Sequence, residues 1–283
     1  MPLLGAHMSI AGGLHLAFIR IRKVKGEALQ IFLSNQRQWH TPPLTDEMIE
    51  AFRLQWQKNR PIVVAAHDSY LINLAAPDQA TVEKSVTAFA DELVRAAALE
   101  IPFLITHPGS HRGQGVEVGL ERFVHNLDSA IRISRTGTVS VLIETTAGQG
   151  TNLGSKFEEI AYILTESHYR DLLGVCFDTS HAFAAGYDLR TPGTYKKTFS
   201  LFDQIIGLQR LKFFHLNDSK RPLGSRVDRH EHIGKGEIGL NGFRLLLNDP
   251  RFQNHPMVLE TPKGKELKED KKNLRILRSL ISR

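Results

Sequence analysis

The chain has 283 residues, of which 41% are hydrophobic, so it can bury a substantial core without disulfides. Lys and Arg outnumber Asp and Glu by 36 to 30, a mild excess that suits a polyanionic partner but is also common among other enzymes. The single cysteine, Cys176, excludes an internal disulfide framework and a Cys-rich zinc module. No segment approaches the ~18 apolar residues of a membrane span, and the first residues lack a secretory signal. We therefore expect a cytoplasmic protein with no membrane partner.

Short apolar runs recur along the chain, and each is typical of a fully buried strand. They are Leu3–Ala6, Leu29–Leu33, Ile62–Ala66, Phe103–Thr106, Val139–Ile143, Gly174–Phe177, Leu211–Phe214 and Met257–Leu259. Longer segments with helical spacing separate these runs. Strict alternation of strand and helix indicates a parallel sheet, because parallel strands need crossover connections. Eight such repeats would close a barrel.

The segments between the runs carry amphipathic helix patterns, most clearly at 82–97 and 120–131. Ser155 and Glu158 form a capping-box pattern before a further helix, and apolar residues at 274–281 suggest a closing helix. No linker or low-complexity tract interrupts the sequence. We predict an α/β fold, a (β/α)8 TIM barrel in one domain spanning 1–283. The alternative, a doubly wound open sheet, is disfavoured because the first strand leads into GAHMSIAGG and not into a dinucleotide-binding glycine motif.

Residues that can bind a metal ion follow seven of the eight predicted strands. They are His7, His67, His107, Glu144, Asp178, His215 and Glu260. In a barrel, the carboxyl ends of all strands meet at one mouth, so these side chains would converge. Histidine and carboxylate are the ligands of zinc or manganese where thiolate is absent. One histidine at a strand end is more often a structural group, but a whole ring of such ends favours a metal site.

Further ligand types lie outside the strand ends. His181 comes three residues after Asp178, and Asp228, His230 and His232 alternate along one segment. If that segment is extended, these alternating side chains share one face and could bind a further metal, although a solvated polar loop is the simpler interpretation. Clustered divalent ions suit phosphate-ester hydrolysis, because they activate water and neutralise charge on the phosphate.

Motifs along the whole chain resemble those of the endonuclease IV family of apurinic/apyrimidinic endonucleases. The matching blocks are GAHMSIAGG from Gly5, NQRQW from Asn35, HDSYLINL from His67, HPGSH from His107, IETTAGQGTNLG from Ile143, CFDTSHAFAAGYDLRTP from Cys176, HLNDSK from His215, GSRVDRHEHIGKGEIG from Gly224 and LETPK from Leu259. Their order and spacing agree from end to end. The resemblance implies a xylose-isomerase-like TIM barrel.

The resemblance also implies three zinc ions per chain. One would be held by His67, His107 and Glu144; Glu144 would bridge to a second ion completed by Asp178, His215 and Glu260; the third would be held by His181, Asp228 and His230. Glu144 and Glu260 are the expected catalytic residues. His7 would act behind the ligands, and His232 falls outside the pattern. Thr145 replaces the family's usual asparagine, which puts the fine positioning of Glu144 in question.

The implied activity is that of a zinc-dependent deoxyribonuclease IV in base excision repair. It would hydrolyse the phosphodiester 5′ to abasic sites in duplex DNA, leaving a 3′-hydroxyl and a 5′-deoxyribose phosphate, and would also clear blocked 3′ ends. The expected DNA-binding residues are Asn35, Gln36, Arg37, Tyr70, Leu71, Arg226 and Arg229. Trp39 and Tyr70 could instead simply pack on the barrel rim. We expect a monomer.

Two other functions stay open at this point. A sugar isomerase or epimerase on a similar barrel would share the histidine and carboxylate strand ends. It would have no need of Asp228 and His230 or of the NQRQW loop at Asn35. A DNA-binding scaffold without metals is the second alternative, and the full set of ligands argues against it.

Overall fold

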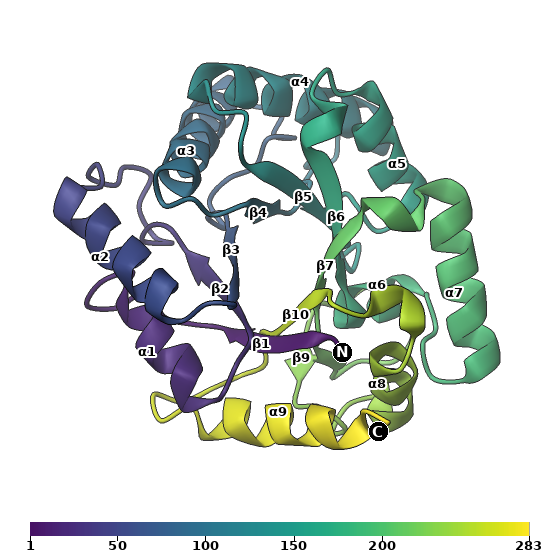
Figure 1. Ribbon diagram of the computed structural model, residues 1–283. Helices are drawn as coiled ribbons and strands as arrows, with labels where there is room; N and C mark the ends of the chain where they lie inside the picture. The colour runs from purple at the N-terminus through teal and green to yellow at the C-terminus, as the bar shows by residue number, and fades with distance from the viewer. Residues whose placement is uncertain (283) are drawn as a thin grey trace.

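The apolar runs form the eight parallel strands of a closed barrel, so the predicted TIM-barrel fold is confirmed (Figure 1). The computed structural model describes residues 1–282. The barrel strands are β1 (Leu3–His7), β2 (Ala28–Phe32), β3 (Val63–His67), β4 (Phe103–Thr106), β5 (Ser140–Glu144), β6 (Leu173–Asp178), β7 (Leu211–His215) and β10 (Pro256–Leu259). The ring closes where β10 pairs with β1, with Leu4 opposite Met257.

Helices surround the strand ring and cover its outer face (Figure 1). They are α1 (Leu16–Lys23), α2 (Asp46–Lys58), α3 (Gln79–Ala98), α4 (Val116–Ser134), α5 (Phe157–Glu166), α6 (Thr179–Ala185), α7 (Pro192–Ile205), α8 (Gly239–Leu247) and α9 (Lys268–Leu280), with short 3₁₀ turns at Arg170–Leu172, Leu208–Arg210 and Pro250–Phe252. None of the helices within residues 1–282 is both long and apolar enough to cross a bilayer.

The capping box expected at Ser155 and Glu158 is wrong. Helix α5 begins only at Phe157, and the preceding Lys156 makes no side-chain cap. The carboxylate of Glu159 instead accepts the backbone N–H groups of Gly154 at 2.6 Å and Ser155 at 3.2 Å. The helix starts one residue later than the sequence pattern suggested. For this reason Glu159, and not Glu158, contacts the backbone that precedes the helix.

The apolar core has two parts, one outside the strand ring and one inside it. The larger part packs the outer strand faces against the helices. A small cluster fills the inside of the barrel and consists of Ala28, Ala65, Ile105, Leu142, Cys176, Phe213 and Val258. Burial in this cluster raises the pKa of the Cys176 thiol, so the thiol stays protonated and inert. The cluster forms the floor beneath the barrel mouth.

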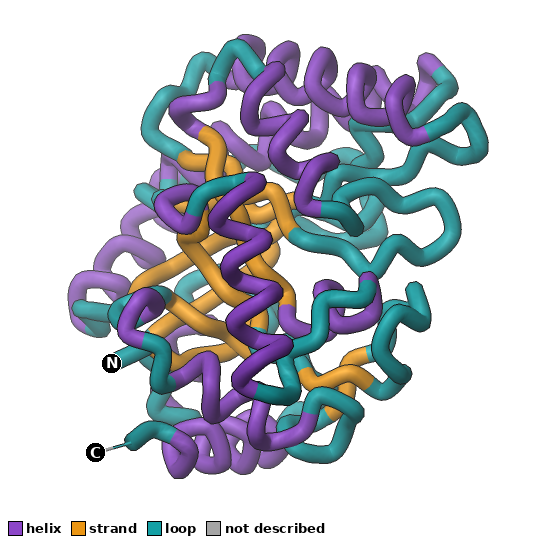
Figure 2. The backbone as a smooth tube through the Cα atoms, turned by 90° about the vertical axis from the view of Figure 1, so that its right-hand side faces the viewer, coloured by secondary structure: helices purple, strands orange, loops and turns teal. Residues whose placement is uncertain are grey.

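A small antiparallel hairpin lies beyond β7 and was not predicted from the sequence. It pairs β8 (Asp218–Ser219) with β9 (His230–Glu231), so that Ser219 lies opposite His230. Figure 2 shows this hairpin and the longer loops on one side of the barrel, with the N-terminus on the other side. The hairpin therefore places its residues at the end of the barrel where the strands finish.

Candidate metal centre

The side chains at the barrel mouth follow from the two-residue period of a strand. Each member of the inner apolar cluster is followed, two positions later, by a polar side chain on the same face. These polar residues are Gln30, His67, His107, Glu144, Asp178, His215 and Glu260. Each strand that contributes to the floor thus also contributes one polar residue to the layer above it.

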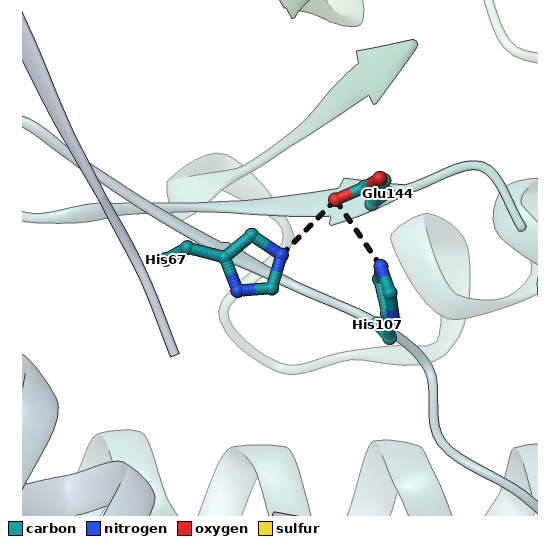
Figure 3. A group of neighbouring side chains, drawn as sticks. All are labelled: His67, His107 and Glu144. Atoms are coloured by element: carbon teal, nitrogen blue, oxygen red, sulfur yellow. Dashed lines mark hydrogen bonds and ion pairs between the residues drawn. The ribbon is translucent and has the colours of Figure 1, made fainter. Parts of the chain in front are cut away.

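The first group of potential ligands contains His67, His107 and Glu144, which face one another (Figure 3). The Nε2 atoms of His67 and His107 lie 3.2 Å and 3.4 Å from the same Glu144 oxygen, Oε2. Their ligand atoms all lie within 4.8 Å of one another. One cation could therefore lie between these three side chains and be bound by all of them.

The second group lies on the other side of the Glu144 carboxylate. His215 Nδ1 is 3.0 Å from Glu144 Oε1, 3.2 Å from Glu260 Oε2 and 3.8 Å from an oxygen of Asp178. These four residues again have ligand atoms within 4.8 Å of one another. Since Oε2 of Glu144 faces the first group and Oε1 faces the second, this fully buried carboxylate lies between the two.

The third group combines the N-terminal turn of α6 with the hairpin. His181 Nε2 and His230 Nε2 lie 3.2 Å and 3.4 Å from the two carboxylate oxygens of Asp228. Asp178 also belongs to this group, since it has a ligand atom within 4.8 Å of those of His181 and His230. Asp178 is therefore shared between the second and third groups, a position that sequence reasoning did not give it.

The charges in this buried layer depend strongly on one another. Burial alone would raise the pKa of Glu144, but the nearby His215 and His107 hold it well below its ordinary value. Burial alone would lower the pKa of His181, yet Asp178 and Asp228 raise it well above the usual range. A cluster of carboxylates that favours protonated histidines also favours bound cations.

The histidines are oriented as metal ligands would be. His67 and His181 each place Nδ1 2.9 Å from a backbone carbonyl oxygen, that of Asp68 or Thr145. A carbonyl oxygen only accepts, so Nδ1 donates to it, and in the neutral ring the Nε2 lone pair points at the carboxylates. This arrangement is typical of zinc-binding histidines, and the nitrogen and oxygen donors suit that ion.

A single buried carboxylate holds the loop that carries Asp228 and His230. Asp218 Oδ1 accepts the backbone N–H groups of Ser219 and Ile238 at 2.9 and 3.0 Å. Its Oδ2 accepts those of Gly234 and Gly236 at 2.9 and 3.0 Å. Gly236 permits this approach, because a Cβ there would meet Asp218 Oδ1 at 2.6 Å. The loop therefore closes back on the start of the hairpin.

Comparisons with known proteins agree along nearly the whole chain. The sequence profile of the xylose isomerase-like TIM barrel family matches residues 18–280. A relative called probable endonuclease 4, from Chloroflexus aggregans, is 53% identical over 281 residues, covering 99% of this chain and 98% of that protein. Another, from Geobacter sulfurreducens, is 48% identical over 280 residues, covering 99% and 95%.

Among solved structures, endonuclease IV from Thermus thermophilus superposes with a TM-score of 0.88 at 38% identity, covering 99% of this chain and 98% of that one. The chain belongs to the endonuclease IV family. A D-psicose 3-epimerase also superposes, with a TM-score of 0.70 over 98% and 97% of the two chains, but its 13% identity shows only a shared fold.

In this endonuclease IV family member, two loops at the barrel mouth are joined to each other. Asn35 and Arg37 are exposed on the loop after β2, and Gln36 Oε1 accepts the backbone N–H of Tyr70 at 3.1 Å. Tyr70 is 66% exposed, while its ring forms a T-shaped contact with Phe32, with 5.4 Å between ring centroids. The ring therefore packs on the rim and still presents most of its surface to solvent.

The remaining expected DNA-binding residues lie on the same end of the barrel. Leu71 is partly buried beside Tyr70, and Trp39 is 38% exposed. Arg226 and Arg229 are exposed on the loop between the hairpin strands. Arg229 Nη1 donates to the backbone carbonyl of Asp228 at 2.6 Å, which places this cation next to the third group of ligands.

Other residues support the ligands without belonging to the three groups. His7 Nδ1 lies 3.6 Å from Glu260, behind the second group. His232 Nδ1 accepts from Asn273 of α9, so this histidine anchors the loop and does not join its neighbours. Thr145 Oγ1 accepts the backbone N–H of Asp178 at 2.9 Å, so the hydroxyl at this position positions the strand end that carries Asp178.

Two residues that the sequence analysis missed contact the candidate ligands directly. Asn217 Nδ2 donates to Asp178 at 2.6 Å, and its Oδ1 accepts the backbone N–H of Glu260 at 2.8 Å. Gln30 contacts both Glu260 and His215. The sequence analysis placed Gln30 inside the predicted strand Leu29–Leu33, and an uncharged amide does not stand out as a ligand type.

Proposed function

We propose that this protein is a zinc-dependent DNA-repair endonuclease that hydrolyses the phosphodiester 5′ to abasic sites in duplex DNA. The observation that carries the proposal is the meeting of three ligand groups around Glu144 and Asp178 at one barrel mouth. Relatives named as probable endonuclease 4, about half identical over nearly the full chain, support the same activity. A cytoplasmic location and a monomeric state are part of the proposal.

Three zinc ions would be held by the three groups of ligands. His67, His107 and Glu144 would hold the first. Zinc bound there would lower the pKa of a water molecule and neutralise charge on the phosphate oxygens. The second would lie with Glu144, Asp178, His215 and Glu260, and the third with His181, Asp228 and His230. Glu144 and Glu260 are the carboxylates closest to His215 and therefore control the charge at the centre of the site.

The loops around the mouth would bind and deform the duplex. Tyr70 is exposed, and its ring packs against Phe32 in a T-shaped contact, so it can stack in the gap that a missing base leaves. Leu71 adds an apolar wedge beside it, and Asn35, Gln36 and Arg37 form the adjoining loop. Arg226 and Arg229 would contact phosphates near the third group of ligands.

The proposed reaction is a hydrolysis. The oxygen of water forms a bond to phosphorus while the bond from phosphorus to the 3′-oxygen breaks. The 3′-oxygen leaves as a hydroxyl, and the phosphate remains on the abasic sugar as a 5′-deoxyribose phosphate. The same chemistry at a strand end would remove a blocking group and restore a 3′-hydroxyl.

The test uses an end-labelled duplex with one abasic-site analogue and a matched intact duplex. We expect incision 5′ to the analogue only, sensitive to a chelator and leaving an end that a polymerase extends. A parallel assay offers D-fructose to the same zinc-loaded protein. Epimerisation of the sugar without incision of DNA would contradict the proposal and favour the alternative that shares this fold.

A further inference from the structure

Gln30 is a buried, uncharged side chain inside the ring of ligands. It lies on β2, has no exposed surface, and points to the same side as Ala28 of the apolar floor. Its amide contacts three other side chains of the mouth: Nε2 lies 2.6 Å from Glu260 Oε1 and 3.0 Å from His7 Nδ1, and Oε1 lies 2.7 Å from His215 Nε2. Every polar atom of this amide therefore faces a residue of the site.

The orientation of the Gln30 amide follows from its neighbours. An ionised Glu260 carboxylate only accepts hydrogen bonds, so the NH₂ group of Gln30 must face it. The amide oxygen then faces His215, and the Nε2 of His215 must donate to that oxygen. In the neutral ring, the lone pair of His215 is therefore on Nδ1, which faces Glu144 Oε1 at 3.0 Å.

The same amide also orients Glu260. Its NH₂ group occupies Oε1 of Glu260, while Oε2 lies 3.2 Å from His215 Nδ1. The second hydrogen of the NH₂ group points to His7 Nδ1, which accepts it. Gln30 thus orients His215 and Glu260 so that the Nδ1 of His215 and the free Oε2 of Glu260 face the same point in the second ligand group. His67 and His181 are oriented by backbone carbonyls, whereas His215 is oriented by a side chain that mutation can change.

We propose that Gln30 is a positioning residue for the second metal group, selecting the His215 tautomer and the free Glu260 oxygen. The inference rests on the proposed zinc chemistry and concerns a residue that lies outside the three ligand groups and has no exposed surface. Partners behind metal ligands of this kind change metal affinity by about 10- to 100-fold when they are replaced. The effect should be confined to one of three ions, because Gln30 touches ligands of the second group only.

The test compares zinc-loaded wild-type protein with Gln30→Leu, and with Gln57→Leu on the exposed face of α2 as the matched control. Each protein is dialysed against increasing chelator, and the zinc remaining per chain is measured. We expect Gln30→Leu to lose one ion at about 10- to 100-fold lower chelator than wild type, with the other two ions held equally. The Gln57→Leu protein should match wild type.

A second variant and a second readout separate positioning from general damage. Gln30→Glu keeps an acceptor for His215 but places a carboxylate against Glu260, so it should also lose one ion early while keeping the His215 tautomer. Heteronuclear NMR of the zinc-loaded proteins reports that tautomer: we expect an Nε2–H on His215 in wild type and in Gln30→Glu. In Gln30→Leu the Nε2–H loses its acceptor, so its signal should shift.

Zinc bound equally tightly by wild type and both Gln30 variants, with the His215 signal unchanged, would overturn the role of Gln30 and leave the proposed function intact. A wild-type protein that binds no zinc would overturn the proposed function, and this inference with it. Thermal unfolding of the metal-free proteins shows whether the variants fold, and early loss of all three ions from a folded Gln30→Leu protein would also contradict a role confined to the second group.

Discussion

The Nε2 atoms of His181 and His230 face each other at 3.4 Å, and the Asp228 carboxylate lies beside both. Two neutral rings cannot both donate a hydrogen bond across this contact, because at most one nitrogen can donate to the other. A cation between the two rings and the carboxylate would satisfy all three. We therefore expect a cation at this position to contribute to the stability of the fold.

Removal of zinc should destabilise the protein. A ligand at 100 times its dissociation constant stabilises a fold by about 2.7 kcal/mol, which corresponds to about 5–10 °C in a chain of this size. We expect a chelator to lower the melting temperature by at least this much, and added zinc, but not magnesium, to restore it. Equal melting temperatures before and after chelation would show that the ligand groups hold no stabilising ion.

Glu144 should be indispensable for activity. Its two oxygens face the first and second ligand groups, and an amide nitrogen in place of either oxygen could not bind a metal. We expect Glu144→Gln, and likewise Glu260→Gln, to reduce incision at least about 100-fold. Exposed Glu121→Gln on α4 is the matched control. Near-normal incision by either active-site variant would refute the three-metal assignment.

Tyr70 should contribute to binding and not to chemistry. Because the ring is mostly exposed, its removal deletes a stacking surface and disturbs the core little. We expect Tyr70→Ala to weaken binding to an abasic duplex by roughly 1–3 kcal/mol, measured by fluorescence anisotropy. Tyr162→Ala, on α5, controls for loss of an exposed tyrosine. If Tyr70→Ala binds as wild type does, the ring only packs the rim.

Asp218 should hold the third ligand group together. Replacement by Asn would leave an amide NH₂ facing two or more backbone donors, at a cost of about 1–3 kcal/mol for each unsatisfied group. We expect Asp218→Asn to retain two zinc ions, to lose the third, and to be cut by protease within 220–239. A variant with three ions and an intact loop would show that the hairpin is held by other contacts.

Stability between about pH 4.5 and 8 should depend on Glu92 of α3. Burial raises the pKa of this carboxyl from 4.5 to about 8, although Ser34 donates to it. The folded-state pKa of Glu92 lies above the unfolded-state value, so protonation of Glu92 favours the folded state. This contribution to the free energy of unfolding is complete below about pH 4.5 and is lost as pH rises through about 8. In the wild-type protein the free energy of unfolding should fall by a few kcal/mol over that range, and Glu92→Gln should abolish this fall. Denaturant unfolding at several pH values measures both. Parallel pH profiles for the two proteins would contradict the shifted pKa.

The sequence predicted the barrel and most of the mouth because both depend on local patterns. A strand of the barrel places residues at two-residue intervals on one face, so a ligand type after an apolar run is already aimed inward, as Leu142 and Glu144 show. Gln30 was missed because an amide is not a common metal ligand, and its role depends on contacts with Glu260 and His215, which are far away in sequence.

The hairpin and the role of Asp218 in holding it could not be predicted from the sequence, for a different reason. The strands β8 and β9 have two residues each, too few to show alternation. The hydrogen bonds of Asp218 go to backbone N–H groups, which carry no sequence signature. The sharing of Asp178 between two ligand groups is likewise a consequence of three-dimensional geometry.

A zinc titration of metal-free protein, with incision of the abasic duplex as the readout, tests the requirement for three zinc ions. Protein freed of metal would receive increasing equivalents of zinc, and the initial rate of 5′ incision would be measured at each step. We predict little incision with the first two ions and a steep rise as the third is bound. Full activity with fewer than three ions, or no incision at any zinc concentration, would contradict the three-zinc proposal.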